Sequence, residues 1–315
     1  MVTRALLDAL PPQLSARREL RALAWAVRRD DDAAGKREYL RTLGDNTARL
    51  AAAAAILDAT AAAGVVMLPL KGALLADVVY GDAGARPMVD LDLAVRLGDL
   101  PAAEAALRPL GFRRIFPADR RHSPPFAHDL ALFDGRQVLE LHFRWLHEFG
   151  ADNGDVEPLF ARAIEVETLG RRRLVPAWDD HLALVAAHAA SHCFAQPLWL
   201  VDLALLVERA GGFAGAAERA RAFGVERAFA TAVTLARLAL PSLPPVRLAP
   251  FAARRARWLA ARLLPTLAAP PSRLESLAAR ALMTDRLLTV ATMLAHKARV
   301  VVDDQWRALR KHVPL

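Results

Sequence analysis

The sequence predicts an α+β fold in which a small mixed β-sheet lies between helical segments. Alanine-rich stretches with apolar residues at helical spacing fill the N-terminal part of the chain and most of it from about residue 176 onwards. Between them, the pattern changes to short apolar runs and to strand-like alternation of polar and apolar residues. We expect a helical N-terminal segment, an α/β core and a mostly helical C-terminal region, over residues 1–47, 48–150 and 151–315.

The composition is that of a soluble chain with a packed core. Hydrophobic residues make up 54% and charged residues 24% of the 315 residues. No apolar run is long and uncharged enough to span a bilayer, and the N-terminus does not resemble a signal peptide. The single cysteine, Cys193, allows no internal disulfide and fits a reducing compartment, so we expect a cytoplasmic protein.

The basic charge of the chain does not by itself predict a nucleic-acid surface. The net charge of +8 would allow an anionic partner. The arginines, however, are spread along the predicted helices, and no aromatic residues alternate with them to form a stacking platform. We therefore expect a small molecule or a protein as partner in preference to nucleic acid.

The predicted core begins after a long helix. The polar triplet 45–47 offers N-caps for this alanine-rich helix, and Gly64 would end it. The apolar run 65–70 then suits a buried strand, and residues 72–80 suit a helix.

Further strands and helices follow in order. Residues 90–95 alternate polar and apolar side chains, as a strand does, and residues 100–111 indicate a short helix that Gly111 ends. An Asp-Gly turn at 134–135 lies between two strand-like segments and predicts a hairpin. We expect its strands at 127–134 and 136–145, and later helices at 178–193, 198–210, 214–223, 225–240, 250–265 and 272–300.

Asp90 and Asp92 are the first candidate functional residues. Alternate residues of a strand point to one face, with Cα atoms about 6.5 Å apart, while Leu91 and Leu93 would point the other way into a core. Two neighbouring carboxylates repel each other unless a cation lies between them, and their oxygens are ligands for Mg²⁺. The pair predicts a metal site, although acidic pairs on exposed strand ends also occur without a metal.

Glu140 could complete this site. It lies in the apolar segment VLELHF, where an acid is costly to bury without a partner. If this strand lies beside strand 90–95, Glu140 joins the two aspartates in a three-carboxylate cluster, with His142 on the same face. The alternative is an edge strand that exposes Glu140 to solvent.

Lys71 and Gly72 lie between a predicted strand and a predicted helix. Glycine allows a phosphate to approach the backbone closely, and a lysine supplies a point charge. Taken alone, the pair would also suit a helix-capping glycine beside a surface lysine. Arg86, four residues before Asp90, could add a second positive charge, or could simply pair with Asp82.

The run LKGALLADVVYGDAGARPMVDLDLAV resembles the uncharacterised nucleotidyltransferase family of the polymerase-beta-like superfamily. It has that family's glycine-containing turn, helix, arginine and D-x-D strand. The resemblance continues through ELHFRW, DDHLALVAAHAASH and WLVDLALLVER, and it covers about residues 65–210.

This resemblance implies the transfer of a nucleoside monophosphate from a nucleoside triphosphate such as ATP to an acceptor hydroxyl, with release of pyrophosphate. The family's metal ligands, for Mg²⁺ or alternatively Mn²⁺, correspond to Asp90, Asp92 and Glu140, and its phosphate-side turn to Lys71 and Gly72. The resemblance does not identify the acceptor, which we expect to be a small molecule or a protein.

One position departs from the superfamily pattern. Ala73 stands where a serine usually follows the glycine and helps to hold the triphosphate. A catalytically degenerate fold that binds without transfer is therefore the alternative, although a relic has no reason to keep a repulsive carboxylate cluster. A glycosyltransferase, whose D-x-D motif also holds a metal, would need a long alternating α/β run before the motif, which this chain lacks.

His188, His192 and Cys193 are weaker candidates. The histidines are four residues apart on one helical face, a spacing that can hold zinc, but Cys193 would point about 100° away and no second pair completes a site. Packing in a core or interface is the simpler interpretation, and we expect no bound zinc. Asp202 is a lone acid among apolar residues, and pairing with one of these histidines would explain it.

Overall fold

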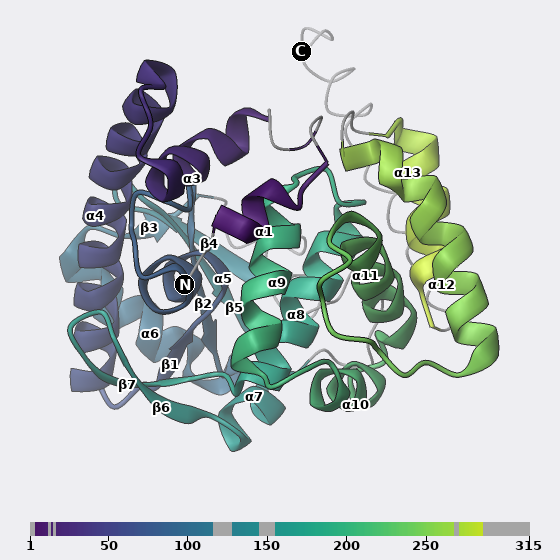
Figure 1. The fold of residues 1–315 in the computed structure, drawn as a ribbon. Coiled ribbons are helices and arrows are strands. Elements are labelled where there is room, and N and C mark those ends of the chain that lie inside the picture. Colours follow the sequence, from purple (N-terminus) through teal and green to yellow (C-terminus); the bar gives the residue numbers. More distant parts are fainter. Residues whose placement is uncertain are drawn as a thin grey trace, which may run out of the picture.

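The α+β class is confirmed by a five-stranded mixed sheet that lies between a long N-terminal helix and a helical C-terminal half (Figure 1). The computed structural model describes residues 4–11, 14, 17–115, 128–144, 155–267 and 271–285.

The N-terminal helices are α1 (Arg4–Asp8), α3 (Arg18–Arg28) and α4 (Ala33–Ala62). Helix α4 begins earlier than predicted, because the Asp32 side chain accepts a hydrogen bond from the Ala34 backbone amide and so forms the N-cap. The predicted start at residues 45–47 is therefore wrong. Gly64 does follow the end of the helix, in the left-handed conformation that glycine favours.

Asn46, from the triplet expected to cap this helix, instead holds a distant loop. Its side-chain amide donates hydrogen bonds to the carbonyl oxygens of Ala83 and Arg86, at 2.6 and 2.7 Å. The loop leads directly into the strand that carries Asp92. A residue type that suits an N-cap is used here for a tertiary contact that no local pattern reveals.

The sheet has the strand order β1-β2-β5-β4-β3. Strand β2 pairs in parallel with β5, and the other described neighbours are antiparallel. This register places Asp92 directly beside Glu140, as the cluster hypothesis requires. The strands span Met67–Pro69 (β1), Leu91–Val95 (β2), Arg113–Arg114 (β3), Asp129–Phe133 (β4) and Val138–His142 (β5).

The two faces of β2 belong to different parts of the molecule. Leu91, Leu93 and Val95 pack into a core with helix α4 and helix α6 (Leu100–Leu107), as the alternation of the strand predicted. Asp92 and Ala94 point to the opposite face. Ala94 belongs to the other core, which the C-terminal helices dominate.

The connection from β1 to β2 is partly an irregular helix. A short α-helix, α5 (Lys71–Leu74), continues directly into the π-helix η1 (Leu75–Tyr80). The predicted helix over 72–80 is thus confirmed, with wider winding in its second half. Short π-helical segments are rare in proteins, and those that do occur often lie at functional sites.

A second hairpin precedes the helical half and was not predicted. After α7 (Glu157–Ala161), strands β6 (Ile164–Thr168) and β7 (Arg171–Val175) pair antiparallel, with Gly170 at positive φ in the turn. The Thr168 hydroxyl and the Leu169 backbone amide donate hydrogen bonds to Asp77 of η1, at 2.7 and 2.8 Å. The hairpin therefore supports the segment that follows Lys71.

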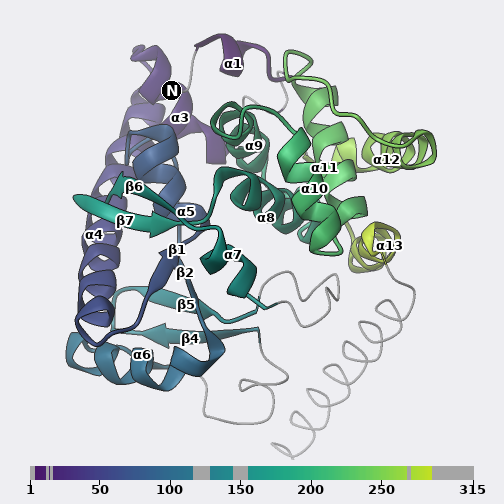
Figure 2. The same cartoon turned by 90° about the horizontal axis from the view of Figure 1, so that it is seen from below.

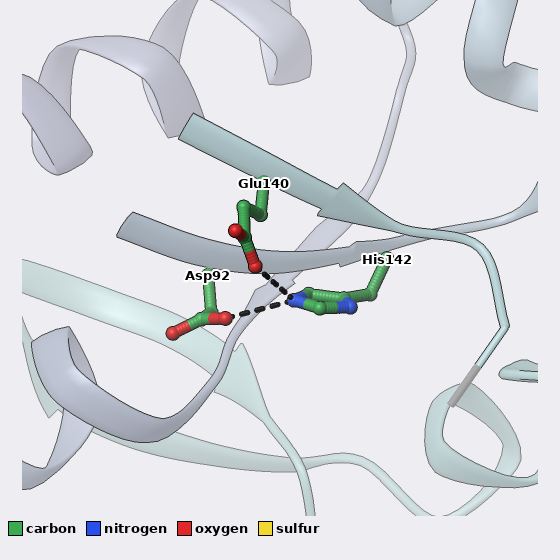
Figure 3. A group of neighbouring side chains, drawn as sticks. All are labelled: Asp92, Glu140 and His142. Atoms are coloured by element: carbon green, nitrogen blue, oxygen red, sulfur yellow. Dashed lines mark hydrogen bonds and ion pairs between the residues drawn. The ribbon is translucent and has the colours of Figure 1, made fainter. Parts of the chain in front are cut away.

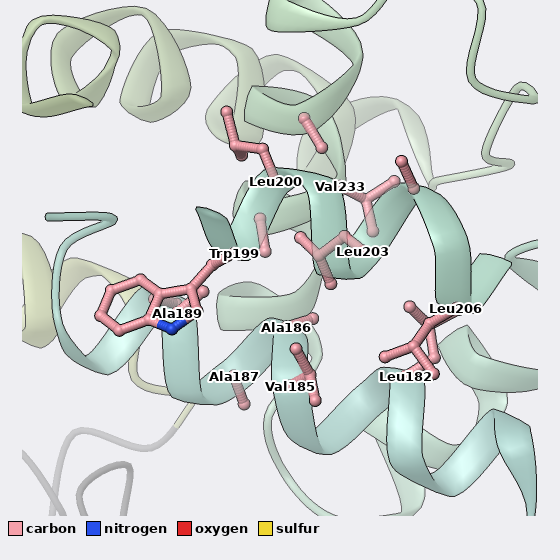
Figure 4. Packing of buried hydrophobic residues seen from close by; sticks show 14 of the residues in the cluster. Leu182, Val185, Ala186, Ala187, Ala189, Trp199, Leu200, Leu203, Leu206 and Val233 are labelled. Carbon is pink, nitrogen blue, oxygen red and sulfur yellow. The ribbon is translucent and has the colours of Figure 1, made fainter. Parts of the chain in front are cut away.

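The C-terminal helices cover the face of the sheet that carries Asp92 (Figures 1 and 2). Buried residues of helices α8, α9 and α11 pack together (Figure 4). The same core includes Leu70, Leu75 and Ala94. The part of the predicted helix 272–300 beyond residue 285 lies outside the described residues. The helices span Trp178–Ser191 (α8), Leu198–Arg209 (α9), Ala214–Ala222 (α10), Glu226–Ala239 (α11), Pro250–Leu263 (α12) and Arg273–Met283 (α13), with a 3-10 turn at Leu264–Leu267.

Among the described residues, we find no helix whose length and hydropathy would suit a membrane span.

Candidate active site

A pocket of about 450 Å³ lies where three parts of the fold meet. The turn after β1 and the start of β2 form its base, helices α3 and α4 form one side, and helices α8 and α9 form the other. Its lining includes Lys71, Gly72, Asp90 and Asp92 from the core, Glu38 and Arg41 from α4, and His188, His192 and Trp199 from α8 and α9.

Two acidic side chains, Asp90 and Asp92, line this pocket, and a third lies beside Asp92 on β5. Asp92 is buried on β2, with Glu140 beside it on β5 (Figure 3). Asp90 precedes the first residue of β2, is half-buried and lines the same pocket. The strand pairing thus brings Asp92 and Glu140 together, and Asp90 lies at the pocket end of the cluster.

His142 joins the two strand carboxylates from the same face of β5. Its Nε2 lies 2.8 Å from Asp92 Oδ1 and 3.4 Å from Glu140 Oε2. Burial and the nearby Lys71 lower the pKa of His142, but the contacts with Asp92 and Glu140 outweigh them and raise it to about 9. At neutral pH and without a metal, His142 therefore carries a proton between the two carboxylates.

Lys71 lies on the other side of Asp92. Its Nζ is 2.5 Å from Asp92 Oδ1. Burial alone would raise the pKa of Asp92, but the Lys71 ammonium and the hydrogen bond with His142 outweigh it and hold that pKa well below its usual range. Asp92 is thus ionised and held between two cationic groups.

The backbone of Lys71 is held in an unusual conformation. Its φ is 36°, in the left-handed region that non-glycine residues rarely adopt. Its amide N–H donates a hydrogen bond to Nε2 of His181, 3.1 Å away on α8. Burial, followed by the charges of Arg86 and Lys71, lowers the pKa of His181 to about 3, so its ring is neutral and can accept this bond.

Gly72 and Ala73 differ in what they face. Gly72 lines the pocket, and a Cβ at this position would come within 3.1 Å of Met88 Cβ, so the loop before Asp90 leaves little room for a side chain. Ala73 is fully buried in the core formed with α4 and α6. The position where the superfamily usually has serine therefore faces the core of this protein.

The charge balance of the cluster suits a cation. Burial, and then repulsion from Asp92 and Glu140, raise the pKa of Asp90 to about 6. The carboxylates of Asp90, Asp92 and Glu140 outnumber the cationic groups of Lys71 and His142 when all are charged. An additional cation beside Asp90 would relieve the remaining repulsion.

Arg86 lines the pocket but is paired within the protein. Its Nε and Nη2 donate to the two carboxylate oxygens of Asp202, at 2.9 and 2.8 Å, and the Tyr80 hydroxyl donates to the same carboxylate at 2.7 Å. All three side chains are buried. Asp202 therefore pairs with Arg86 and not with one of the histidines. The alternative pairing of Arg86 with Asp82 is wrong for the same reason. Whether Arg86 also acts on a phosphate stays a prediction.

The His188–His192 pair packs against an aromatic ring. The two imidazole centroids are 4.7 Å apart, and they lie 5.3 and 5.5 Å from the Trp199 ring. Within the described residues, the His, Cys, Asp and Glu side chains grouped closely enough to hold a metal are Asp92, Glu140 and His142, whose ligand atoms all lie within 4.8 Å of one another. The expectation of no zinc at the histidine pair stays a prediction.

The sequence interpretation missed two residues of this region. His181 was noted only within the DDHLALVAAHAASH run, and Tyr80 only as the end of a helix. A histidine inside an otherwise apolar helix was the available signal, since a buried imidazole needs a polar partner. Its partner, the Lys71 amide, is 110 residues away and has no local signature.

A family model gives the relationship of this chain to known proteins. No curated protein matches the chain. Among solved structures, the solution structure of the antibiotic-resistance factor ANT(2'')-Ia aligns with a TM-score of 0.43 and 18% identity, over 56% of this chain and 92% of that one. A family model described as "Uncharacterised nucleotidyltransferase" matches residues 32–241. Because this match spans more than half of the chain, the protein belongs to the uncharacterised nucleotidyltransferase family.

Proposed function

We propose that this protein is a Mg²⁺-dependent nucleotidyltransferase that moves a nucleoside monophosphate from a nucleoside triphosphate to an acceptor hydroxyl. The observation that carries the proposal is that Asp90, Asp92 and Lys71 line a pocket large enough for a small ligand, with Glu140 beside Asp92 on the neighbouring strand. The family match supports the same reaction class.

Asp90, Asp92 and Glu140 are the residues proposed to hold the metal. Carboxylate oxygens are the ligands that Mg²⁺ prefers, whereas an imidazole suits other metals better. His142, protonated and in contact with both strand carboxylates, is better suited to orient them than to act as a ligand. When bound, Mg²⁺ would offset negative charge on the triphosphate and stabilise the charge that develops as pyrophosphate leaves; Mn²⁺ is the alternative.

Lys71 is proposed to meet the outer phosphates. Its ammonium lies at the base of the pocket, and the adjacent Gly72 presents no side chain there. A lysine at this place can offset the charge that grows on the β- and γ-phosphates as pyrophosphate leaves. To do so it must give up at least part of its contact with Asp92.

The transfer step is an in-line displacement. The acceptor oxygen forms a bond to the α-phosphorus, the bond from the α-phosphorus to the leaving oxygen breaks, and pyrophosphate departs. Glu140 is proposed to complete the metal site or to take the hydroxyl proton. The hydrogen bond with His142 lowers the pKa of Glu140, so this carboxylate is ionised at neutral pH.

A binding protein with a degenerate fold is the second candidate, and Ala73 was the reason to consider it. In the structure, Ala73 packs in the core and does not line the pocket, so this departure removes no side chain from the pocket. The carboxylates at the pocket are also intact. We therefore favour an active transferase.

Label transfer tests the proposal. The protein is incubated with Mg²⁺ and an α-³²P-labelled nucleoside triphosphate, separately with small-molecule and protein fractions of a cell extract. We expect Mg²⁺-dependent labelling together with pyrophosphate release, both lost in Asp92→Asn. The control is Glu104→Gln, because Glu104 pairs with Arg114 outside the pocket. Tight Mg²⁺-dependent nucleotide binding without pyrophosphate release from any of the four common triphosphates would instead favour the degenerate binding protein.

A further inference from the structure

Three rings, those of His188, His192 and Trp199, lie together in the lining of the pocket and form one wall of it. The His188 and Trp199 rings meet edge to face, and the His192 ring is tilted against both. All three residues line the pocket, from α8 and α9. Figure 4 shows Trp199 at the edge of the apolar packing between these helices, well away from Leu206.

The His188 ring in this wall is neutral. Burial, and then the charges of Lys71 and His192, lower the pKa of His188 well below its ordinary value, so its ring is neutral. Among the described residues of α8 and α9 that line the pocket there is no lysine or arginine, and the one acid, Asp202, is already paired with Arg86. Aromatic rings bind the faces and edges of other flat rings.

The pocket lining therefore has two chemically different parts. One part is Lys71 with Asp90 and Asp92, and the other is the three rings with the apolar side chains of Val185 and Leu198. The volume of about 450 Å³ is of the size that holds one small organic ligand. A nucleotide also has two such parts: a polyanionic phosphate chain and a flat, uncharged base.

We propose that His188, His192 and Trp199 form the nucleobase subsite of this pocket, and that they bind the base by ring contacts. This inference rests on the proposed function, since it assumes that the phosphates lie beside Lys71. Stacking is available to every base. The subsite therefore accepts ATP, GTP, CTP and UTP with affinities within about tenfold of one another, and the larger purines bind more tightly.

The experiment compares Mg²⁺-ATP with Mg²⁺-tripolyphosphate, a probe that has the phosphates but no base. His192 is the site for the first variant because its side chain is exposed, so its removal disturbs packing least. We expect His192→Ala to weaken ATP binding at least about fivefold and to leave tripolyphosphate binding unchanged. His192→Phe, which keeps a ring, restores most of the ATP affinity.

Two further variants control the result. Glu104→Gln changes a residue that pairs with Arg114 outside the pocket, and it leaves both affinities unchanged. Trp199→Leu weakens ATP binding more than Trp199→Phe does, and thermal unfolding confirms that both variants are folded.

The outcomes separate this inference from the proposed function. If ATP and tripolyphosphate affinities fall together, or if neither changes in His192→Ala and Trp199→Leu, the nucleobase assignment is wrong. If neither ligand binds the unmodified protein, the proposed function itself fails. Tripolyphosphate binding that is unaffected, with ATP binding lost in the ring variants, is the result that supports the subsite.

Discussion

The Lys71 ammonium lies 2.5 Å from the Asp92 carboxylate, so the lysine expected to meet a phosphate contacts the aspartate expected to hold a metal. Because the Lys71 backbone is fixed by the hydrogen bond to His181, only the flexible side chain has to move when a ligand enters. The contact keeps Asp92 ionised in the ligand-free protein. In the proposed mechanism, Lys71 contacts first this carboxylate and then a phosphate of the triphosphate.

Replacing Lys71 with alanine should weaken triphosphate binding more than monophosphate binding. One charge-assisted contact to the outer phosphates contributes about 1.5–3 kcal/mol, which corresponds to roughly 10- to 150-fold in affinity. Titration of Mg²⁺-ATP and AMP into the wild type and Lys71→Ala measures the difference. Lys71→Met, which keeps most of the side-chain volume, controls for packing. Equal losses for both nucleotides would show that Lys71 does not meet the outer phosphates.

Replacing Asp90 with asparagine should stabilise the metal-free protein at neutral pH. The folded-state pKa of about 6 lies above the ordinary value of an aspartate. The folded protein therefore binds this proton more tightly than the unfolded chain, and the free energy of unfolding falls as pH rises from about 4 to about 6. The asparagine amide does not titrate in this range, so the variant should gain on the order of 1 kcal/mol over the wild type above pH 6 and nothing near pH 4.

Urea unfolding in EDTA at several pH values measures this gain, and added Mg²⁺ provides the internal control. Mg²⁺ should stabilise the wild type at pH 7.5 and have less effect on Asp90→Asn. A variant that is no more stable than the wild type at pH 7.5, and that responds equally to Mg²⁺, would remove Asp90 from the metal site.

Breaking the Arg86–Asp202 pair should destabilise the fold strongly. Either Arg86→Ala or Asp202→Ala leaves a buried charge without its partner, which costs about 3–5 kcal/mol. The singles Arg86→Met and Asp202→Leu form a cycle with their double variant, which should lose less stability than the sum of these two singles. A double-mutant cycle by urea unfolding measures the coupling, and single losses below about 1 kcal/mol would contradict the burial of this pair.

The protein as purified should contain no stoichiometric zinc. His188 and His192 contact each other and Trp199, and Cys193 donates to the Ser276 carbonyl oxygen instead of pointing to the pair. Elemental analysis tests this expectation. One zinc per chain that disappears in His188→Ala would contradict it and would also remove these histidines from the nucleobase subsite.

The parts of the fold that the sequence predicted correctly are those with a strong local pattern. The alternation in residues 90–95 gave both the strand and the direction of its side chains, because a strand has a period of two residues. The Asp134-Gly135 turn placed the β4–β5 hairpin. The long apolar stripes of α8 and α9 predicted that both helices are buried, and their apolar residues do pack in one core with residues of the sheet.

The features that escaped prediction depend on partners far away in the chain. Asn46 was interpreted as a helix cap, but its amide holds a loop 37 to 40 residues further on. Arg86 was expected to face a ligand, and its carboxylate partner lies 116 residues away. The β6–β7 hairpin was missed although β6 (IEVET) alternates apolar and polar residues, because the arginine-rich β7 (RRRLV) lacks this alternation. A local pattern predicts the type of a secondary-structure element more readily than it predicts which polar groups pair with each other.

Binding of Mg²⁺-ATP to the wild type and to Asp92→Asn, measured by isothermal titration calorimetry, tests the central claim most directly. Asp92 contacts Lys71 and His142 and lies beside Glu140, so its carboxylate is common to the metal and phosphate assignments. We expect the wild type to bind ATP tightly only with Mg²⁺, and the folded Asp92→Asn variant to lose this Mg²⁺-dependent binding. Equal Mg²⁺-dependent ATP binding by both proteins would contradict the account.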